Sequence, residues 1–142
     1  MAKKSIDIHK AAGIVIVERK LLVTREKGKD IFISPGGVVE KGEDPKSTVI
    51  RELMEEVSLV VDLKDLEDFG VYYADAANHP GSWLKMEVFN VKSWLGEPIP
   101  NNGEEEIEEI LWLTSKIPGG IKVGSIYEHE VIPRLKSRGL ID

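Results

Sequence analysis

The segment Gly36–Leu59, GGVVEKGEDPKSTVIRELMEEVSL, constrains the fold of this chain more than any other part of the sequence. Asp44 is a residue type that favours the N-cap of a helix, and Pro45 suits the first helical position. An apolar face at helical spacing is formed by Val49, Ile50, Leu53 and Val57. The segment therefore predicts a capped helix that buries one stripe against a core.

The same helix carries a second stripe, which is made of carboxylates. Glu52, Glu55 and Glu56 stand at positions i, i+3 and i+4, so they share one helical face. This face is centred about 120° from the apolar one on a helical wheel. Taken alone, such a stripe is most simply a solvated acidic face. Three neighbouring carboxylates also suit a hard divalent cation such as Mg²⁺ or Mn²⁺.

The residues before the helix favour the second interpretation. We expect Pro35–Gly42 to form a loop, because glycine allows close approach and backbone angles that other residues resist. A backbone carbonyl of this loop would point at the cation, and Gly42 would turn the chain so that Glu43 returns to the helix start. A magnesium site of this kind suits phosphoryl or nucleotidyl transfer to water, with a carboxylate as general base.

Composition excludes several other classes of site. The chain of 142 residues has no cysteine, so thiol catalysis and thiolate zinc sites are excluded, and its three histidines are too far apart in sequence for a zinc motif. A net charge of −6 argues against binding a long nucleic acid, although a small anionic substrate remains compatible with a bound metal. We find no membrane span and no signal peptide, and expect a cytoplasmic protein. A homodimer is compatible with the sequence, but no feature requires one.

The remaining pattern predicts mixed α/β layers in one domain that spans residues 1–142. Strands are expected at Ala11–Val17, Leu21–Thr24, Ile31–Ser34, Phe69–Ala76, Trp83–Lys92 and Ile107–Leu113, with a hairpin turn at Glu18–Lys20 between the first two. A closing helix is expected at Ser125–Ser137, which Pro133 either kinks or divides.

The spacing of the segment resembles the Nudix box, Gly-x5-Glu-x7-Arg-Glu-U-x-Glu-Glu-x-Gly-U, in which U is a bulky aliphatic residue. The matching residues are Gly37, Glu43, Arg51, Glu52, Leu53, Glu55, Glu56 and Leu59, and only Ser58 departs from the pattern, where the box has glycine. At ordinary composition, the six Gly, Glu and Arg matches would coincide by chance about once in 10⁷ windows.

The resemblance implies an α/β/α sandwich with a mixed sheet and hydrolysis of a diphosphate linkage in a nucleoside di- or triphosphate derivative. It implies that Glu52, Glu55, Glu56 and the carbonyl of Gly37 bind the metal, that Arg51 orients the glutamates, and that Glu43 supports the loop–helix junction. The catalytic residues implied are Glu52, our first candidate for the general base, and Glu55, with Glu105 representing the acidic run Glu104–Glu106 of a distant loop. For that run, a solvated loop is the simpler interpretation.

Four questions stay open at this level. Arg25 is our candidate for contact with substrate phosphates, although a surface ion pair would explain it equally well. Ser58 would cost about 1–2 kcal/mol if it keeps the left-handed conformation that glycine usually takes after a helix. A nucleotide-sensing or protein-binding module with little turnover and a metal-binding structural domain are the alternatives to an enzyme. The resemblance implies a small nucleotide as substrate, and the sequence leaves a triphosphate, an oxidised triphosphate and a nucleotide sugar open.

Overall fold

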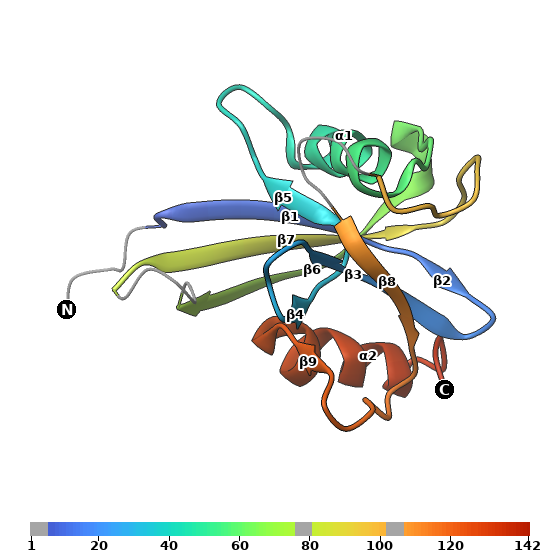
Figure 1. The fold of residues 1–142 in the computed structure, drawn as a ribbon. Helices are drawn as coiled ribbons and strands as arrows, with labels where there is room; N and C mark the ends of the chain where they lie inside the picture. Colours follow the sequence, from blue (N-terminus) through green and yellow to red (C-terminus); the bar gives the residue numbers. More distant parts are fainter. Residues whose placement is uncertain (1–5, 76–80, 102–106) are drawn as a thin grey trace.

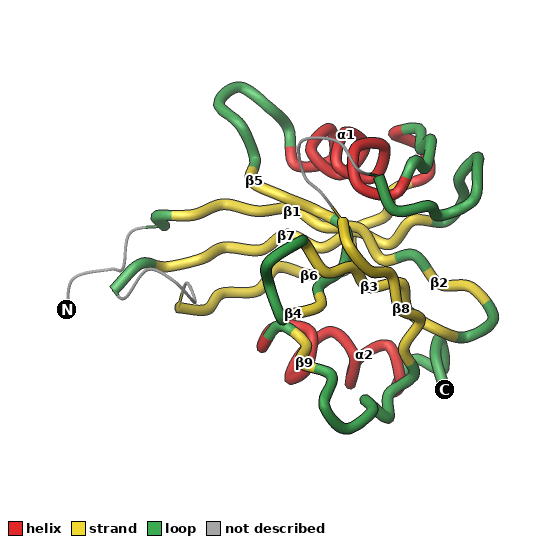
Figure 2. Tube along the Cα trace, in the orientation of Figure 1, coloured by secondary structure: helices red, strands yellow, loops and turns green. Residues whose placement is uncertain are grey.

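A mixed β-sheet lies between two helices in the computed structural model of the chain, which describes residues 6–75, 81–101 and 107–142 (Figures 1 and 2). Its strands are β1 (Ile8–Ile14), β2 (Ile16–Val17), β3 (Lys20–Glu26), β4 (Ile31–Phe32), β5 (Gly36–Val38), β6 (Leu66–Asp75), β7 (Trp83–Val91), β8 (Ile107–Leu113) and β9 (Lys122–Val123). Its helical elements are α1 (Pro45–Val57), the short η1 (Leu63–Asp65), η2 (Tyr127–Val131) and α2 (Ile132–Ser137).

The main sheet has the strand order β5-β1-β7-β6. The pair β1–β7 is parallel, whereas β1–β5 and β6–β7 are antiparallel. A second sheet has the order β2-β3-β8, and β4 pairs with β9. Helix α1 covers one side of the strands and α2 covers the other (Figure 1). The α/β/α sandwich with a mixed sheet is therefore confirmed.

Strand β1 divides the apolar residues into two cores, because neighbouring side chains of a strand point to opposite faces. Ala11 belongs to the cluster that contains Leu53 and Val57 of α1, whereas Ala12 belongs to the cluster that contains Leu135 of α2. Residues 11–14 of β1 are buried on both faces of the strand, which explains why this half of β1 is small and apolar.

Helix α1 begins where the sequence predicts and buries Val49, Leu53 and Val57 of the predicted apolar face. The Asp44 side chain accepts a hydrogen bond from the Lys46 amide at 2.8 Å, and Pro45 opens the helix. Beyond Val57, Ser58 adopts left-handed angles of φ 60° and ψ 30°. Its amide donates to the Met54 carbonyl at 3.2 Å, so the helix ends in the conformation for which glycine is the usual residue.

The C-terminal helix changes its winding before Pro133. Residues 125–137 are helical, but Tyr127–Val131 form a π-helical turn in which the Ile132 amide donates to the Tyr127 carbonyl. Proline lacks an amide hydrogen and crowds the preceding turn of an α-helix. The wider turn of a π-helix fits the position of Pro133 immediately after it, so the structure resolves the expected interruption as a change of winding.

Three further details differ from the sequence prediction. Gly36–Val38 is not loop but the edge strand β5, paired with β1 through Ala11 and Ala12. The predicted strand Ala11–Val17 begins three residues earlier and breaks at Val15 into β1 and β2. The short strand β9 was not predicted, because two residues carry no periodicity.

Within the residues that the structure describes, no helix is both long and apolar enough to span a membrane.

Candidate functional site

The two glycines of β5 bring the strand unusually close to its neighbours on either side. A Cβ atom on Gly36 would lie 2.3 Å from the Ala11 carbonyl oxygen and 2.7 Å from Ala12 Cα. A Cβ atom on Gly37 would lie 2.3 Å from Oε1 of Glu52. Neither glycine has a positive φ. Their role is therefore close approach, to strand β1 at Gly36 and to the carboxylate of α1 at Gly37.

Two of the three glutamates on the acidic stripe are buried against this strand. Glu52 is 2% exposed and Glu56 is 1% exposed, while the side chain of Glu55 is 46% exposed. The Gly36 amide donates to Oε2 of Glu56 at 2.8 Å. A helical wheel places the three carboxylates on one stripe, but it does not show that β5 closes over two of them. Buried carboxylates are costly unless donors or cations satisfy them, so this burial indicates a site with a specific purpose.

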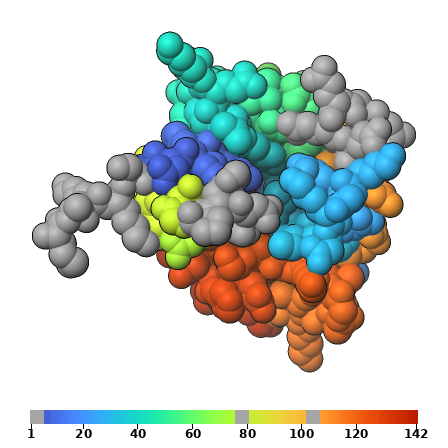
Figure 3. All heavy atoms as spheres, turned by 60° about the vertical axis from the view of Figure 1, so that its left-hand side comes forward, coloured from blue at the N-terminus to red at the C-terminus, as the bar shows by residue number. Residues whose placement is uncertain are grey.

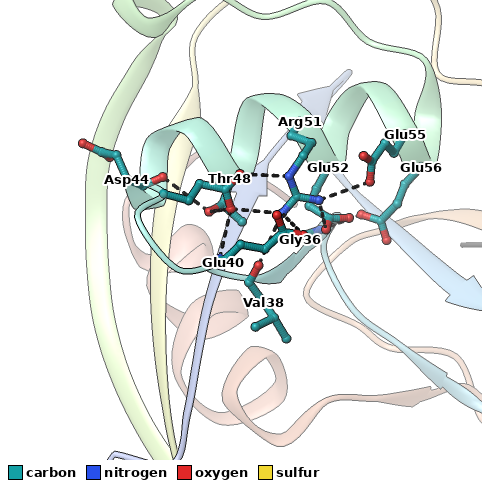
Figure 4. Close-up of polar contacts among 10 residues, drawn as sticks. Gly36, Val38, Glu40, Asp44, Thr48, Arg51, Glu52, Glu55 and Glu56 are labelled. Atoms are coloured by element: carbon teal, nitrogen blue, oxygen red, sulfur yellow. Dashed lines mark hydrogen bonds and ion pairs between the residues drawn. The ribbon is translucent and has the colours of Figure 1, made fainter.

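Arg51 lies at the centre of the carboxylates (Figure 4). Its Nη1 donates to Oε1 of Glu52 at 2.9 Å and to Oε2 of Glu55 at 3.2 Å. Its Nε and Nη2 form a two-point pair with Glu43 at 2.9 and 3.0 Å. Nη2 also lies 3.7 Å from Oε1 of Glu40. One guanidinium thus contacts four carboxylates, and the cluster of these five side chains keeps a net negative charge.

Glu43 is held firmly at the start of the helix. Oε1 of Glu43 accepts the Thr48 hydroxyl at 2.6 Å and the Glu40 amide at 3.2 Å, in addition to the pair with Arg51. The hydrogen bonds from Arg51, with smaller contributions from Thr48 and the Glu40 amide, lower the pKa of Glu43 from 4.5 to about 2. The Arg51 pKa is raised in return, chiefly by its hydrogen bond to Glu43. Glu43 thereby ties the segment between β5 and α1 to the start of the helix. This segment, teal in Figure 3, projects from the surface.

The donor set fits a hard divalent cation. Carboxylate and carbonyl oxygens are what Mg²⁺ and Mn²⁺ prefer, and one arginine among several carboxylates leaves negative charge for a cation to neutralise. In the described ranges 6–75, 81–101 and 107–142, no group of three or more acidic or histidine side chains already stands arranged to hold a metal. Arg51 binds one oxygen of Glu52 and one oxygen of Glu55, and the second oxygen of each carboxylate would be the one to ligate a cation.

The structure does not bring every predicted residue to this cluster. Arg25 forms ion pairs with Glu108 at 3.6 Å and Glu109 at 3.3 Å, across the pair of strands β3 and β8. Its role in substrate binding stays a prediction. The candidate Glu105, with Glu104 and Glu106, lies outside the described residues.

Two participants were missed by the sequence analysis. Thr48 binds Glu43 through its hydroxyl, and the Gly36 amide binds Glu56. Thr48 follows the N-cap by four residues on the side of the helix that faces Glu43, a position from which a hydroxyl can bind the end of the preceding loop. The Gly36 contact required the pairing of β5 with β1, which has no local signal.

The chain is similar to several known proteins. The family model described as NUDIX domain matches residues 7–120. The chain is 34% identical over 110 residues to the 8-oxo-dGTP diphosphatase of Haemophilus influenzae, covering 74% of this chain and 76% of that protein. It is 36% identical over 78 residues to the ADP-ribose pyrophosphatase of Methanocaldococcus jannaschii, covering 51% of this chain and 45% of that protein. The solution structure of the E. coli ORF135 protein superimposes with a TM-score of 0.72 at 18% identity, covering 92% and 91% of the two chains, and shows a shared fold.

Proposed function

The chain belongs to the Nudix family of pyrophosphohydrolases, and we propose that it hydrolyses a diphosphate linkage in a nucleoside di- or triphosphate derivative with the help of a divalent cation, Mg²⁺ or Mn²⁺. The observation that carries the proposal is the burial of the Glu52 and Glu56 carboxylates under β5, beside the exposed Glu55. Buried negative charge next to a solvent-facing carboxylate suits a cation that contacts the protein and a phosphate at once.

The residues of this cluster have distinct proposed roles. Glu52, Glu55, Glu56 and the Gly37 carbonyl would hold the cation, which when bound neutralises phosphate charge and lowers the pKa of a ligated water. Glu52 is the first candidate to accept the proton of the attacking water, followed by Glu55 and by Glu105 of the distant loop. Arg51 would hold the carboxylates of Glu52 and Glu55 in position until the cation is bound, and Glu43 holds the Arg51 guanidinium in position.

The identity of the relatives directs the choice of substrate. The Haemophilus influenzae relative, which shares the larger part of its length with this chain, is named for a nucleoside triphosphate with an oxidised base. We therefore propose a nucleoside triphosphate, normal or oxidised, cleaved to the monophosphate and pyrophosphate. ADP-ribose is the second candidate, because the Methanocaldococcus jannaschii relative is named for it.

A substrate panel with product analysis tests the proposal. The purified chain is incubated with Mg²⁺ and with nucleoside triphosphates, 8-oxo-dGTP and ADP-ribose, and the products are separated by chromatography. Glu55→Gln should lower turnover about 100-fold or more, because it removes a charged ligand, while the exposed Glu67→Gln on β6 should leave turnover unchanged. Binding of these nucleotides without turnover of any of them would favour the sensing module over the enzyme.

A further inference from the structure

Two tryptophans line a groove that lies outside the carboxylate cluster. The groove has a volume of about 390 Å³, and it is bordered by the turn between β2 and β3, by the segment after β7 and by β8. Its apolar walls include Val17, Trp94, Pro98 and Trp112. The exposed fractions of Trp112 and Val17 are 36% and 38%. Apolar side chains that gather around an open hollow mark a binding site on a folded protein.

The groove lies away from the Nudix box. Strand β8 begins beside Glu56, because the Asn101 amide donates to the Glu56 carbonyl at 2.9 Å and the Ile107 amide donates to the Asn101 carbonyl at 3.2 Å. Trp112 follows Ile107 by five residues of this strand, which corresponds to about 17 Å. Strand β2 at the groove and strand β5 at the carboxylate cluster also lie on opposite sides of the molecule in Figure 1. An occupant of the groove would therefore not touch the carboxylates of the box.

Both walls of the groove are held in place by the fold. On one side, the amides of Val60 and Leu95 donate to each other's carbonyls at 3.0 and 2.9 Å, which ties the segment after β7 to the chain beyond α1. On the other side, Glu18 and Arg19 form the hairpin turn with φ of 50° and 64°, and such left-handed angles cost about 1–2 kcal/mol per residue. Nε of Arg19 offsets part of this cost by donating to Oδ1 of Asp142 at 2.6 Å. A groove that is already formed loses little entropy when it binds a ligand.

The chemistry of the walls matches a proline-rich peptide segment. An indole ring offers a flat apolar face and one N–H donor. Within residues 6–75, 81–101 and 107–142, no hydrogen bond engages the indole N–H of Trp94 or Trp112. A polyproline II helix presents proline rings on its sides and carbonyls that have no internal partner, and its conformation is largely set before it binds. Two indole rings beside Pro98 therefore suit both the rings and the carbonyls of such a segment.

The charged side chains of the groove favour a segment that carries a basic residue. Glu18 and Glu97 are exposed in its lining, and neither carboxylate forms an ion pair within the part of the chain that the structure describes. Lys20 also lines the groove, so its charged groups sum to a net negative charge. We propose that the groove binds a proline-rich segment of a partner protein as a polyproline II helix, with a basic residue of that segment beside Glu18 and Glu97. This activity is separate from the proposed hydrolysis.

Titration calorimetry of the whole chain tests the proposal with synthetic peptides. The probe is a short oligoproline peptide that ends in arginine. The comparison peptides are an oligoproline that ends in glutamate and a glycine–serine peptide of the same length that ends in arginine. We expect saturable binding of the probe, about 3-fold weaker binding of the glutamate-ended oligoproline, and no saturation by the glycine–serine peptide up to about 1 mM.

Variants locate the binding. Trp112→Ala should weaken binding of the probe about 10-fold or more, because aromatic side chains dominate the energetics of such interfaces. Trp83 is the matched control, since it lies on β7 outside the groove, where its ring stacks on Tyr73 at 6.2 Å. Trp83→Ala should therefore leave the affinity unchanged. The double variant Glu18→Gln with Glu97→Gln should bind the arginine-ended and glutamate-ended oligoprolines equally.

Each contrary outcome is specific. No saturable binding of the arginine-ended oligoproline by the folded wild type would overturn the proposal. Binding of the glycine–serine peptide as tight as that of the probe would also overturn it, because the groove would then bind the guanidinium and not the proline helix. Equal weakening in Trp112→Ala and Trp83→Ala would place the binding outside the groove. Thermal unfolding establishes that each variant is folded, and the double glutamine variant tests the groove through exposed residues should Trp112→Ala fail to fold.

Discussion

Replacing Gly37 by alanine should damage activity far more than stability. The new Cβ atom would lie 2.3 Å from Oε1 of Glu52, whereas ordinary contacts begin at 3.4 Å, so the carboxylate must move by about 1 Å. Misplacing a reacting group by this much costs about 100-fold in rate. The displaced atoms are the end of a side chain and Gly37 has no positive φ, so the backbone can stay in place. We expect kcat/KM to fall about 100-fold and the free energy of unfolding to fall by about 1–2 kcal/mol, from the weakened bond to Arg51.

The neighbouring Gly36→Ala is the matched comparison, because its Cβ would meet backbone. The contacts are 2.3 Å to the Ala11 carbonyl oxygen and 2.7 Å to Ala12 Cα. Neither atom can move without the strand, so this variant should lose about 2–3 kcal/mol of stability. Urea unfolding and steady-state kinetics at saturating Mg²⁺ measure both effects. Wild-type kcat/KM in Gly37→Ala would refute the reasoning, because the buried Glu52 would then have no part in the reaction.

Three further substitutions test the frame around the site. Glu43→Gln should lower the free energy of unfolding by about 3 kcal/mol at neutral pH, because the pKa of Glu43 in the folded protein, about 2, lies below the ordinary 4.5. The difference in stability from the wild type should be complete above pH 4.5 and shrink as the pH falls towards 2. Urea unfolding across that pH range measures it. Arg51→Lys should lower stability by about 1–2 kcal/mol and turnover by about 10-fold. The reason is that a lysine ammonium cannot form two parallel hydrogen bonds to Glu43 and also bind Glu52, as the guanidinium does. A folded variant with unchanged kinetics would contradict this. Ser58→Gly should raise stability by about 1 kcal/mol, because glycine adopts the left-handed φ of 60° without the strain that a serine has there. Turnover should stay unchanged. A large loss of turnover in the folded variant would show that Ser58 has a role in the chemistry.

The helix was predictable because its signals are local. Asp44 and Pro45 determine where α1 begins, and the structure agrees. Of the predicted apolar stripe, Val49, Leu53 and Val57 are buried and Ile50 is half-buried. Ser58 was also interpretable in advance, since the position after a helix end favours left-handed angles whichever residue occupies it.

The pairing of β5 was not predictable, because it depends on residues distant in sequence. Gly36 and Gly37 were expected to form a loop, whereas their lack of side chains allows the chain to pair with Ala11 and Ala12 as an edge strand. The burial of Glu52 and Glu56 follows from that pairing and could not be read from the helix alone.

The most direct test of the account is Mg²⁺-dependent release of pyrophosphate from nucleoside triphosphates, 8-oxo-dGTP included, by the wild type, Glu55→Gln and Glu56→Gln. The account predicts that turnover requires the divalent cation and falls about 100-fold or more in each variant, since each loses a charged oxygen of the proposed cation site. Turnover by both folded variants at the wild-type rate would contradict the assignment of the site to these carboxylates.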